Sequence, residues 1–201
     1  MKCGGKREQD KFYSGRGSLE EFSAPYVEWI TKFIFERDIK VVIDLGCGDF
    51  RVGQRLCAAS SIDYIGVDIV PELIVYNQAQ FGNEHASFRC TNIIDDELPG
   101  GELCLIRQVL QHLSNDEIRR VIANCKNYRY LLVTEDVYAG KKLEPNLDMS
   151  HGPDTRTYKQ SGVFLELAPF NLPTRCVLEI SRPQLGTVIR TCLIEQKPSI
   201  P

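Results

Sequence analysis

The chain has 201 residues, of which 24 are Lys or Arg and 27 are Asp or Glu, and 43% of its residues are hydrophobic. This length favours a single domain, and the ordinary apolar and charged fractions exclude disordered, fibrous and collagen-like classes. The formal net charge of −3 gives no general reason to expect nucleic acid or an anionic membrane as a partner. No signal-peptide stretch or membrane-spanning apolar run is present. We therefore expect a soluble, cytoplasmic protein with no membrane partner, and the oligomeric state stays open.

Eight cysteines are scattered singly along the chain, without Cys-x-x-Cys spacing or a nearby pair of histidines. The pattern of a metal finger is thus missing, and we expect no metal site. A chain of this length buries a core without disulfides. Several cysteines also lie inside apolar runs, such as residues 103–105, where a thiol packs as a small hydrophobe. We predict that the cysteines are reduced.

Helical and extended patterns alternate along the first two thirds of the chain. Ser23 as N-cap and Pro25 in the first turn predict a helix over 23–38. Apolar, β-branched runs predict strands and periodic segments predict helices, with Ser114 capping the last helix. The expected strands are 40–45, 64–68, 87–90, 103–106 and 130–134, and the further helices are 52–59, 71–81 and 116–125. This alternation predicts a doubly wound α/β domain.

The alternation stops after Asp136. Residues 137–174 carry Gly, Pro, Asn and Asp without a sustained period, and we interpret them as a substrate-side insertion, with a plain surface loop as the alternative. Residues 175–180 and 187–193 alternate apolar and polar side chains, which predicts an antiparallel hairpin. We expect one domain over 23–201, with a seven-stranded sheet that is mostly parallel and ends in this antiparallel hairpin.

The turn after the first strand, Gly46-Cys47-Gly48, lies where open α/β sheets bind nucleotides, but it lacks the third glycine of a dinucleotide fingerprint. Asp44 precedes it at the carboxyl end of the strand. There a carboxylate repels a pyrophosphate and attracts a cationic group, such as the sulfonium and ammonium of S-adenosylmethionine. Asp68 ends the second strand, where a carboxylate accepts hydrogen bonds from ribose hydroxyls. An NAD-dependent oxidoreductase is therefore disfavoured.

Together these motifs resemble the class I S-adenosylmethionine-dependent methyltransferases, whose fold is Rossmann-like. The resemblance extends from Val41 to Asp136 and rests on segments 42–49, 67–69, 91–93 and 107–113, while Phe50 stands where many members have a third glycine. It implies S-adenosylmethionine as cofactor. The cofactor contacts that it implies come from Asp44, Leu45, Gly46, Cys47, Gly48, Asp49, Asp68, Ile69, Asn92, Ile93, Gln108 and Val109.

Methyl transfer from a sulfonium is an in-line displacement, so the protein must align the acceptor, exclude water and deprotonate an accepting hydroxyl. Catalytic candidates on the segments after the fourth and fifth strands are His112, Glu135 and Asp136, with Tyr138 and His151 as further candidates. A pocket-lining role is the alternative for His112, and a solvated loop position is the alternative for His151. These proton acceptors favour transfer to an oxygen, or else a nitrogen, of a small molecule.

Residues 1–22 form a separate polar segment that we interpret as a lid, with a frayed tail as the alternative. Within it, Arg16 is a candidate partner for the cofactor carboxylate or for an acidic substrate. Two other functions stay open. One is an RNA or protein methyltransferase, although no basic run or aromatic stripe indicates a nucleic-acid partner. The other is a non-catalytic module that binds S-adenosylmethionine.

Overall fold

A computed structural model describes residues 20–196 of the chain. Seven strands form one sheet in the order β3-β2-β1-β4-β5-β7-β6. Their bounds are β1 Val41–Leu45, β2 Asp63–Asp68, β3 Ala86–Cys90, β4 Leu103–Arg107, β5 Tyr130–Tyr138, β6 Arg175–Arg182 and β7 Thr187–Glu195. The first five strands pair in parallel, and β7 runs antiparallel to both β5 and β6. The expected α/β sheet with its antiparallel hairpin is confirmed.

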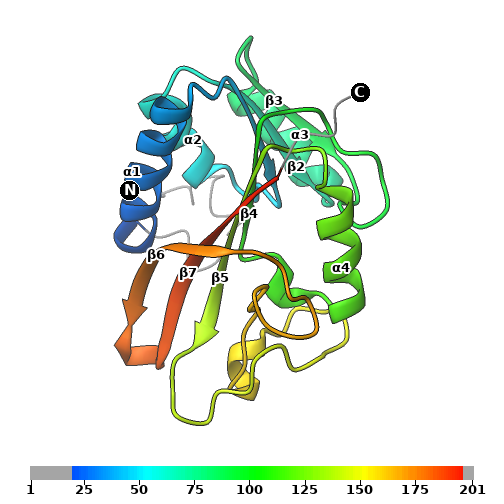
Figure 1. The fold of residues 1–201 in the computed structure, drawn as a ribbon. Helices are drawn as coiled ribbons and strands as arrows, with labels where there is room; N and C mark the ends of the chain where they lie inside the picture. The colour runs from blue at the N-terminus through cyan, green and yellow to red at the C-terminus, as the bar shows by residue number, and fades with distance from the viewer. Residues whose placement is uncertain (1–19, 197–201) are drawn as a thin grey trace, which may run out of the picture.

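Helices cover both faces of the sheet (Figure 1). On one face lie α1 (Glu20–Arg37), α2 (Arg51–Ala59) and α3 (Pro71–Phe81), which share one apolar core with the sheet. On the other face lies α4 (Asn115–Asn124), which packs in a second core. The cysteines among residues 20–196 are all free thiols. Within the same residues, no helix combines the length and the hydropathy that crossing a membrane requires.

The two predicted helix caps have different outcomes. Ser114 caps α4 as expected, and it forms a capping box with Glu117. The prediction for Ser23 is wrong, because the helix already includes Glu20 and Ser23 is buried inside it. There the Ser23 hydroxyl accepts a hydrogen bond from Arg55 of α2. Ser23 therefore connects α1 to α2 from within α1 and does not mark the start of the helix.

Strand β5 is four residues longer than the sequence predicts, because β7 pairs with it along its whole length, as far as Tyr138 opposite Thr187. Glu135 and Asp136 therefore lie inside the strand instead of at its end. Consecutive side chains of a strand project to opposite faces. The two neighbouring carboxylates consequently point to opposite sides of the sheet.

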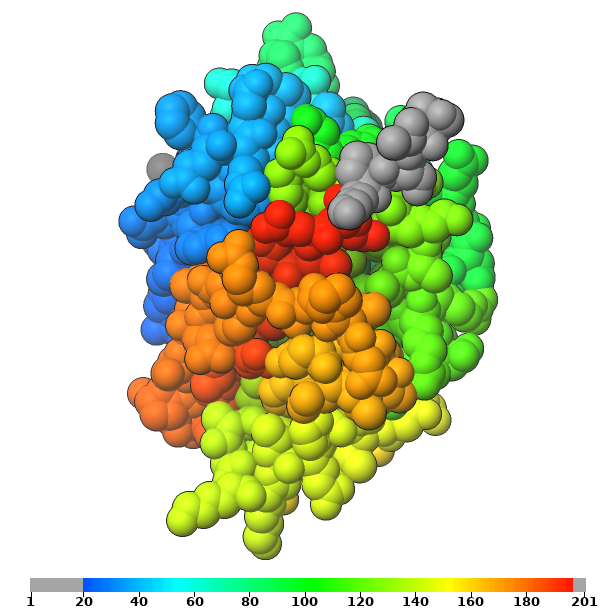
Figure 2. Space-filling model, in the orientation of Figure 1, coloured from blue at the N-terminus to red at the C-terminus, as the bar shows by residue number. Residues whose placement is uncertain are grey.

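The segment after β5 is packed against the domain. The buried side chain of Arg156 donates to the carbonyl oxygens of Leu147 and Leu110 and to Asn115 Oδ1, at 2.9–3.1 Å. The buried Asn146 donates from its amide and accepts at Oδ1 from Phe164 N. In the space-filling view, this segment lies directly below the C-terminal strands (Figure 2). These contacts hold it as a fixed wall.

Candidate active site

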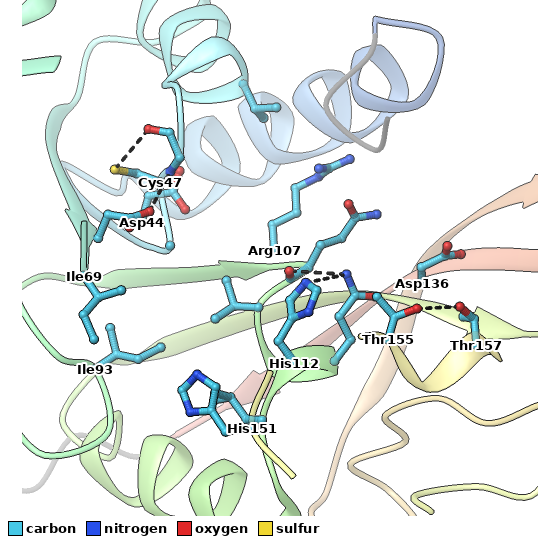
Figure 3. A pocket seen from close by; sticks show the side chains of 18 of the residues that line it. Asp44, Cys47, Ile69, Ile93, Arg107, His112, Asp136, His151, Thr155 and Thr157 are labelled. Carbon is cyan, nitrogen blue, oxygen red and sulfur yellow. Dashed lines mark hydrogen bonds between the residues drawn. The ribbon is translucent and has the colours of Figure 1, made fainter. Parts of the chain in front are cut away.

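A cavity of about 850 Å³ opens at the carboxyl ends of the parallel strands. The loops after β1, β2, β3 and β4 form one side of it. The other side comes from β5, from residues 151–158 and from the β6–β7 hairpin. Ligands of open α/β sheets bind at this edge. Figure 3 shows the loop with Asp44 and Cys47 across the cavity from Asp136.

The loop after β1 is fixed by its backbone. The N–H groups of Gly46 and Cys47 both donate to the carbonyl oxygen of Val67, at 2.7 and 3.0 Å. Gly46 has a φ of +80°, and a Cβ on it would lie 2.3 Å from Val109 Cγ2. Asn77 of α3 holds the far side of the loop by donating to the Gly48 carbonyl at 2.7 Å. A glycine is therefore required at position 46 for both conformation and space.

Asp44 is a buried carboxylate in the cavity wall. Its Oδ2 accepts a hydrogen bond from the Tyr64 hydroxyl at 2.7 Å. Burial raises the pKa of Asp44 to about 6, although the Tyr64 hydrogen bond and the positive charge of Arg107 act in the opposite direction. A negative charge held here favours a cationic ligand and disfavours a phosphate.

Asp68 lies beside the same loop, at the end of β2. Its Oδ2 accepts from Gly48 N at 3.1 Å and its Oδ1 accepts from Val70 N at 3.2 Å. These bonds orient the carboxylate, and each oxygen keeps a lone pair for a further donor. Next to it, Ile69 and Ile93 give the cavity apolar walls. The set of groups fits S-adenosylmethionine, which has a cationic end, ribose hydroxyls and a flat adenine.

The cavity brings together most of the residues expected to contact the cofactor. Those that line it are Asp44, Gly46, Cys47, Gly48, Asp49, Asp68, Ile69, Asn92, Ile93, Gln108 and Val109. Leu45 does not line it, because its side chain is fully buried in the core against α4. Arg16 and most of the segment 1–22 lie outside the described residues. Residues 20–22 of that segment belong to α1.

Glu135 is placed differently from the expectation. It is 2% exposed and does not line the cavity. Its two oxygens accept the backbone N–H groups of Val109, Leu110 and Gln111, at 2.8–3.2 Å. Burial raises its pKa to about 8, against the effect of these three bonds. Glu135 thus binds the backbone N–H groups at the start of the 3-10 helix η3 (Leu110–His112). Its side chain does not face the cavity.

The other two catalytic candidates both line the cavity. His112 Nδ1 lies 3.1 Å from the carbonyl oxygen of Asp154, so Nδ1 carries the proton and Nε2 keeps its lone pair. Asp136 Oδ2 accepts from Arg182 Nη1 at 2.7 Å, and burial raises the Asp136 pKa. The further candidate His151 contacts Glu117 Oε1 at 3.0 Å through its Nδ1. The further candidate Tyr138 also lines the cavity.

Sequence reasoning missed several residues in the cavity wall. They include Tyr26 on α1 and Arg182, Leu185 and Thr187 at the tip of the hairpin. The signal for the hairpin was available, because β7 runs antiparallel to β5 and its first residue must lie at the carboxyl end of β5. Tyr26 carried no such signal, since its helical spacing is that of any core residue. Across the described residues, no group of three or more His, Cys, Asp or Glu side chains is arranged to hold a metal ion.

Comparison with known proteins agrees with this geometry. Residues 42–129 match the family described as "Methyltransferase domain". With the fold and the cofactor loops, this match supports the resemblance of this part of the chain to the class I S-adenosylmethionine-dependent methyltransferases, and it is consistent with S-adenosylmethionine as the cofactor. No curated protein sequence matches the chain.

Solved structures share the fold at low identity. The methyltransferase domain of bacterial CtHen1-CN is 14% identical with a TM-score of 0.60, over 88% of this chain and 98% of that one. The N-terminal domain of EvdMO1, with S-adenosylhomocysteine bound, is 10% identical with a TM-score of 0.62, over 96% and 86%. A Burkholderia thailandensis 1,6-didemethyltoxoflavin-N1-methyltransferase, with 1,6-didemethyltoxoflavin and S-adenosylhomocysteine bound, is 19% identical with a TM-score of 0.58, over 89% and 80%.

Proposed function

We propose that this methyltransferase acts on an oxygen or nitrogen of a small molecule. The observation that carries the proposal is the shape of the cavity, which continues past the cofactor loops to residues such as Thr155, Tyr158 and Leu185. Its volume of about 850 Å³ lies in the range of small-molecule sites. The structural likeness to an enzyme named for methylating a small heterocycle supports the same class of acceptor.

The charges in the cavity wall favour a small molecule over RNA. Among the described residues that line the cavity, the arginines are Arg107 and Arg182, and no lysine is present. Arg182 is neutralised by Asp136, and Arg107 faces the negative charge of Asp44. An RNA-binding surface needs a basic patch that follows the phosphate backbone. The cavity wall has no such patch.

Each cofactor group has a proposed partner. S-adenosylmethionine, when bound, supplies an activated methyl group. Asp68 would accept from the ribose hydroxyls, and Asp44 would face the cationic end. Ile69 and Ile93 would contact the adenine, and the loop of Gly46 would line the cofactor side of the cavity.

We assign the removal of the acceptor's proton to His112. Its Nδ1–H is held by the Asp154 carbonyl, which leaves Nε2 as the basic atom. Gln111 Nε2 lies 3.4 Å from that atom, so the methyl acceptor has to displace this long contact to reach the Nε2 lone pair. The backbone of η3 is in turn fixed by Glu135, so the position of His112 depends on a carboxylate that does not touch the substrate.

The test measures release of S-adenosylhomocysteine from S-adenosylmethionine with three kinds of acceptor: a panel of phenols and lactams, total RNA, and a protein extract. We expect turnover with members of the small-molecule panel. In the variant His112→Gln we expect a decrease in kcat of about 100-fold or more with unchanged affinity for S-adenosylhomocysteine. Turnover on RNA or protein alone would contradict the acceptor class. Cofactor binding without turnover on any of the three would favour a binding module.

A further inference from the structure

Three polar side chains at one end of the cavity carry atoms without partners. Asp136 Oδ1, Arg182 Nε and Thr187 Oγ1 are buried, and none of them has a hydrogen-bond partner in the described part of the chain. All three residues line the cavity. A buried polar atom without a partner destabilises the fold, so such atoms are rare in folded proteins. Three of them in one place indicate a site that a ligand completes.

The strand register brings the three side chains together. Thr187 on β7 lies opposite Arg182 on β6 and opposite Tyr138 on β5, and Tyr138 is two residues from Asp136. Directly opposed residues, and residues two apart on a strand, share a face of the sheet. Asp136, Thr187 and Arg182 therefore project from the same face, the one that α1 covers.

Further contacts fix this group in place. Arg182 Nη1 donates to Asp136 Oδ2 at 2.7 Å, and the guanidinium lies 4.9 Å from the centre of the Phe22 ring. The Thr187 hydroxyl lies close enough to Asp136 to act on it as a hydrogen-bond donor, which opposes the rise in the pKa of Asp136. No contact of Thr187 Oγ1 or of Asp136 Oδ1 has full hydrogen-bond geometry, however. The cluster is thus paired on one side, while Arg182 Nε, Asp136 Oδ1 and Thr187 Oγ1 are buried at the cavity wall without full hydrogen-bond partners.

The available atoms define the chemistry of the ligand. Arg182 Nε offers a donor, Asp136 Oδ1 offers an acceptor, and the Thr187 hydroxyl offers either. The charges of Asp136 and Arg182 cancel, so a carboxylate ligand would meet Asp136 and an ammonium ligand would meet Arg182. A neutral group with a donor beside an acceptor satisfies all of these atoms. Leu185, which is half exposed at the cavity wall, provides apolar contact for the body of such a molecule.

We propose that Asp136, Arg182 and Thr187 form the recognition subsite for the methyl acceptor, and that the acceptor is a neutral molecule with an adjacent hydrogen-bond donor and acceptor, as in a lactam. The inference rests on the proposed transfer to a small molecule and specifies its class. Asp136 is then a positioning residue, and the proton-accepting role stays with His112.

The test uses the full chain saturated with S-adenosylhomocysteine and two matched probes. 2-Quinolone is a bicyclic lactam, and N-methyl-2-quinolone lacks its N–H donor. Binding is followed by ligand-observed NMR titration. We expect 2-quinolone to bind about tenfold more tightly than the N-methyl compound, the effect of one hydrogen bond to a carboxylate.

The variant Thr187→Val removes the hydroxyl and keeps the shape of the side chain, and Thr191→Val is its matched control. Thr191 lies on the same strand and the same face, and its hydroxyl is already bonded to Thr134 Oγ1 at 3.0 Å. We expect Thr187→Val to weaken binding of 2-quinolone about fivefold without changing the affinity for S-adenosylhomocysteine. Thr191→Val should leave the affinities for both ligands unchanged.

Unfolding in urea separates recognition from a structural role. Thr187→Val removes an unpaired buried hydroxyl, so its urea midpoint should stay equal or rise. Thr191→Val removes the hydrogen bond between the Thr191 and Thr134 hydroxyls, so its midpoint should fall. Equal affinity for the two quinolones, or equal effects of the two variants on 2-quinolone binding, would overturn the subsite and leave methyl transfer standing. Absence of binding by S-adenosylhomocysteine itself would contradict the proposed function, and the subsite with it.

Discussion

Asp44 makes cofactor binding depend on pH. Its pKa of about 6 in the folded protein means that the carboxylate is about nine-tenths protonated at pH 5. A cationic ligand binds the ionised form, so we expect the affinity for S-adenosylmethionine to fall about tenfold between pH 7.5 and pH 5. Isothermal titration calorimetry at several pH values in this range measures the affinity for S-adenosylmethionine. The variant Asp44→Asn should bind weakly with a flat pH profile, and an equally steep profile in that variant would contradict the assignment to Asp44.

The same shift in the Asp44 pKa has the opposite effect on the stability of the unliganded protein. Folding raises the pKa of the Asp44 carboxyl group from 3.8 to about 6. Between these two pH values the folded state therefore binds more protons than the unfolded state. The free energy of unfolding contributed by this group therefore falls as the pH rises from 3.8 to about 6. Ligand binding and folding thus place opposite demands on one carboxylate, which is typical of a functional position.

Asp68 provides a test of the ribose contact with a matched control on its own strand. Asp68→Asn removes the charge that strengthens hydrogen bonds to the ribose, so we expect a loss of about 1.5–3 kcal/mol in binding of S-adenosylhomocysteine. Asp63→Asn changes the same residue type at the opposite end of β2, where it contacts the exposed His85. That control should bind normally. Equal affinities of the two variants would remove Asp68 from the proposed cofactor site.

At the scale of elements, the turn between β1 and α2 is the most constrained connection. Gly46→Ala forces a residue with a Cβ to adopt a φ of +80° and brings that Cβ within 2.3 Å of Val109 Cγ2. We expect a loss of about 2–3 kcal/mol in the free energy of unfolding, together with loss of cofactor binding. Gly100→Ala is the control, because a Cβ there meets nothing within 4 Å. Urea denaturation should place the control within about 0.5 kcal/mol of the wild type.

The sequence predicts a feature of this site correctly where neighbouring residues in the chain determine that feature. The turn at Gly46 and the carboxylate Asp68 were identified because each ends its own apolar strand. The length of β5 was not predicted correctly. Residues 135–138 are extended only because they pair with β7, some 50 residues later in the chain. Because the strand was expected to end at residue 134, Glu135 was expected near the reacting groups. Arg182 and Thr187 were missed for the same reason, since only the sheet brings the hairpin tip to the cavity.

For the molecule as a whole, cofactor binding should appear as thermal stabilisation. A ligand that binds only the folded state at 100 times its Kd adds about 2.7 kcal/mol. For a chain of 201 residues this corresponds to a rise in Tm of about 5–11 °C. We expect that rise with S-adenosylhomocysteine and none with NAD, as measured by calorimetry. The reverse result would point to the dinucleotide-binding alternative.

The alternation of side chains along β5 has one last consequence. Glu135 points to one face and fixes the backbone that carries His112, while Asp136 points to the other face and belongs to the cluster with Arg182. An insertion or deletion of one residue within β5 would exchange the two faces. Substitutions at the hairpin tip, by contrast, leave both strand and cofactor loops in place. Laboratory evolution toward new acceptors should therefore accumulate changes at residues 182–187 and tolerate no change in the length of β5.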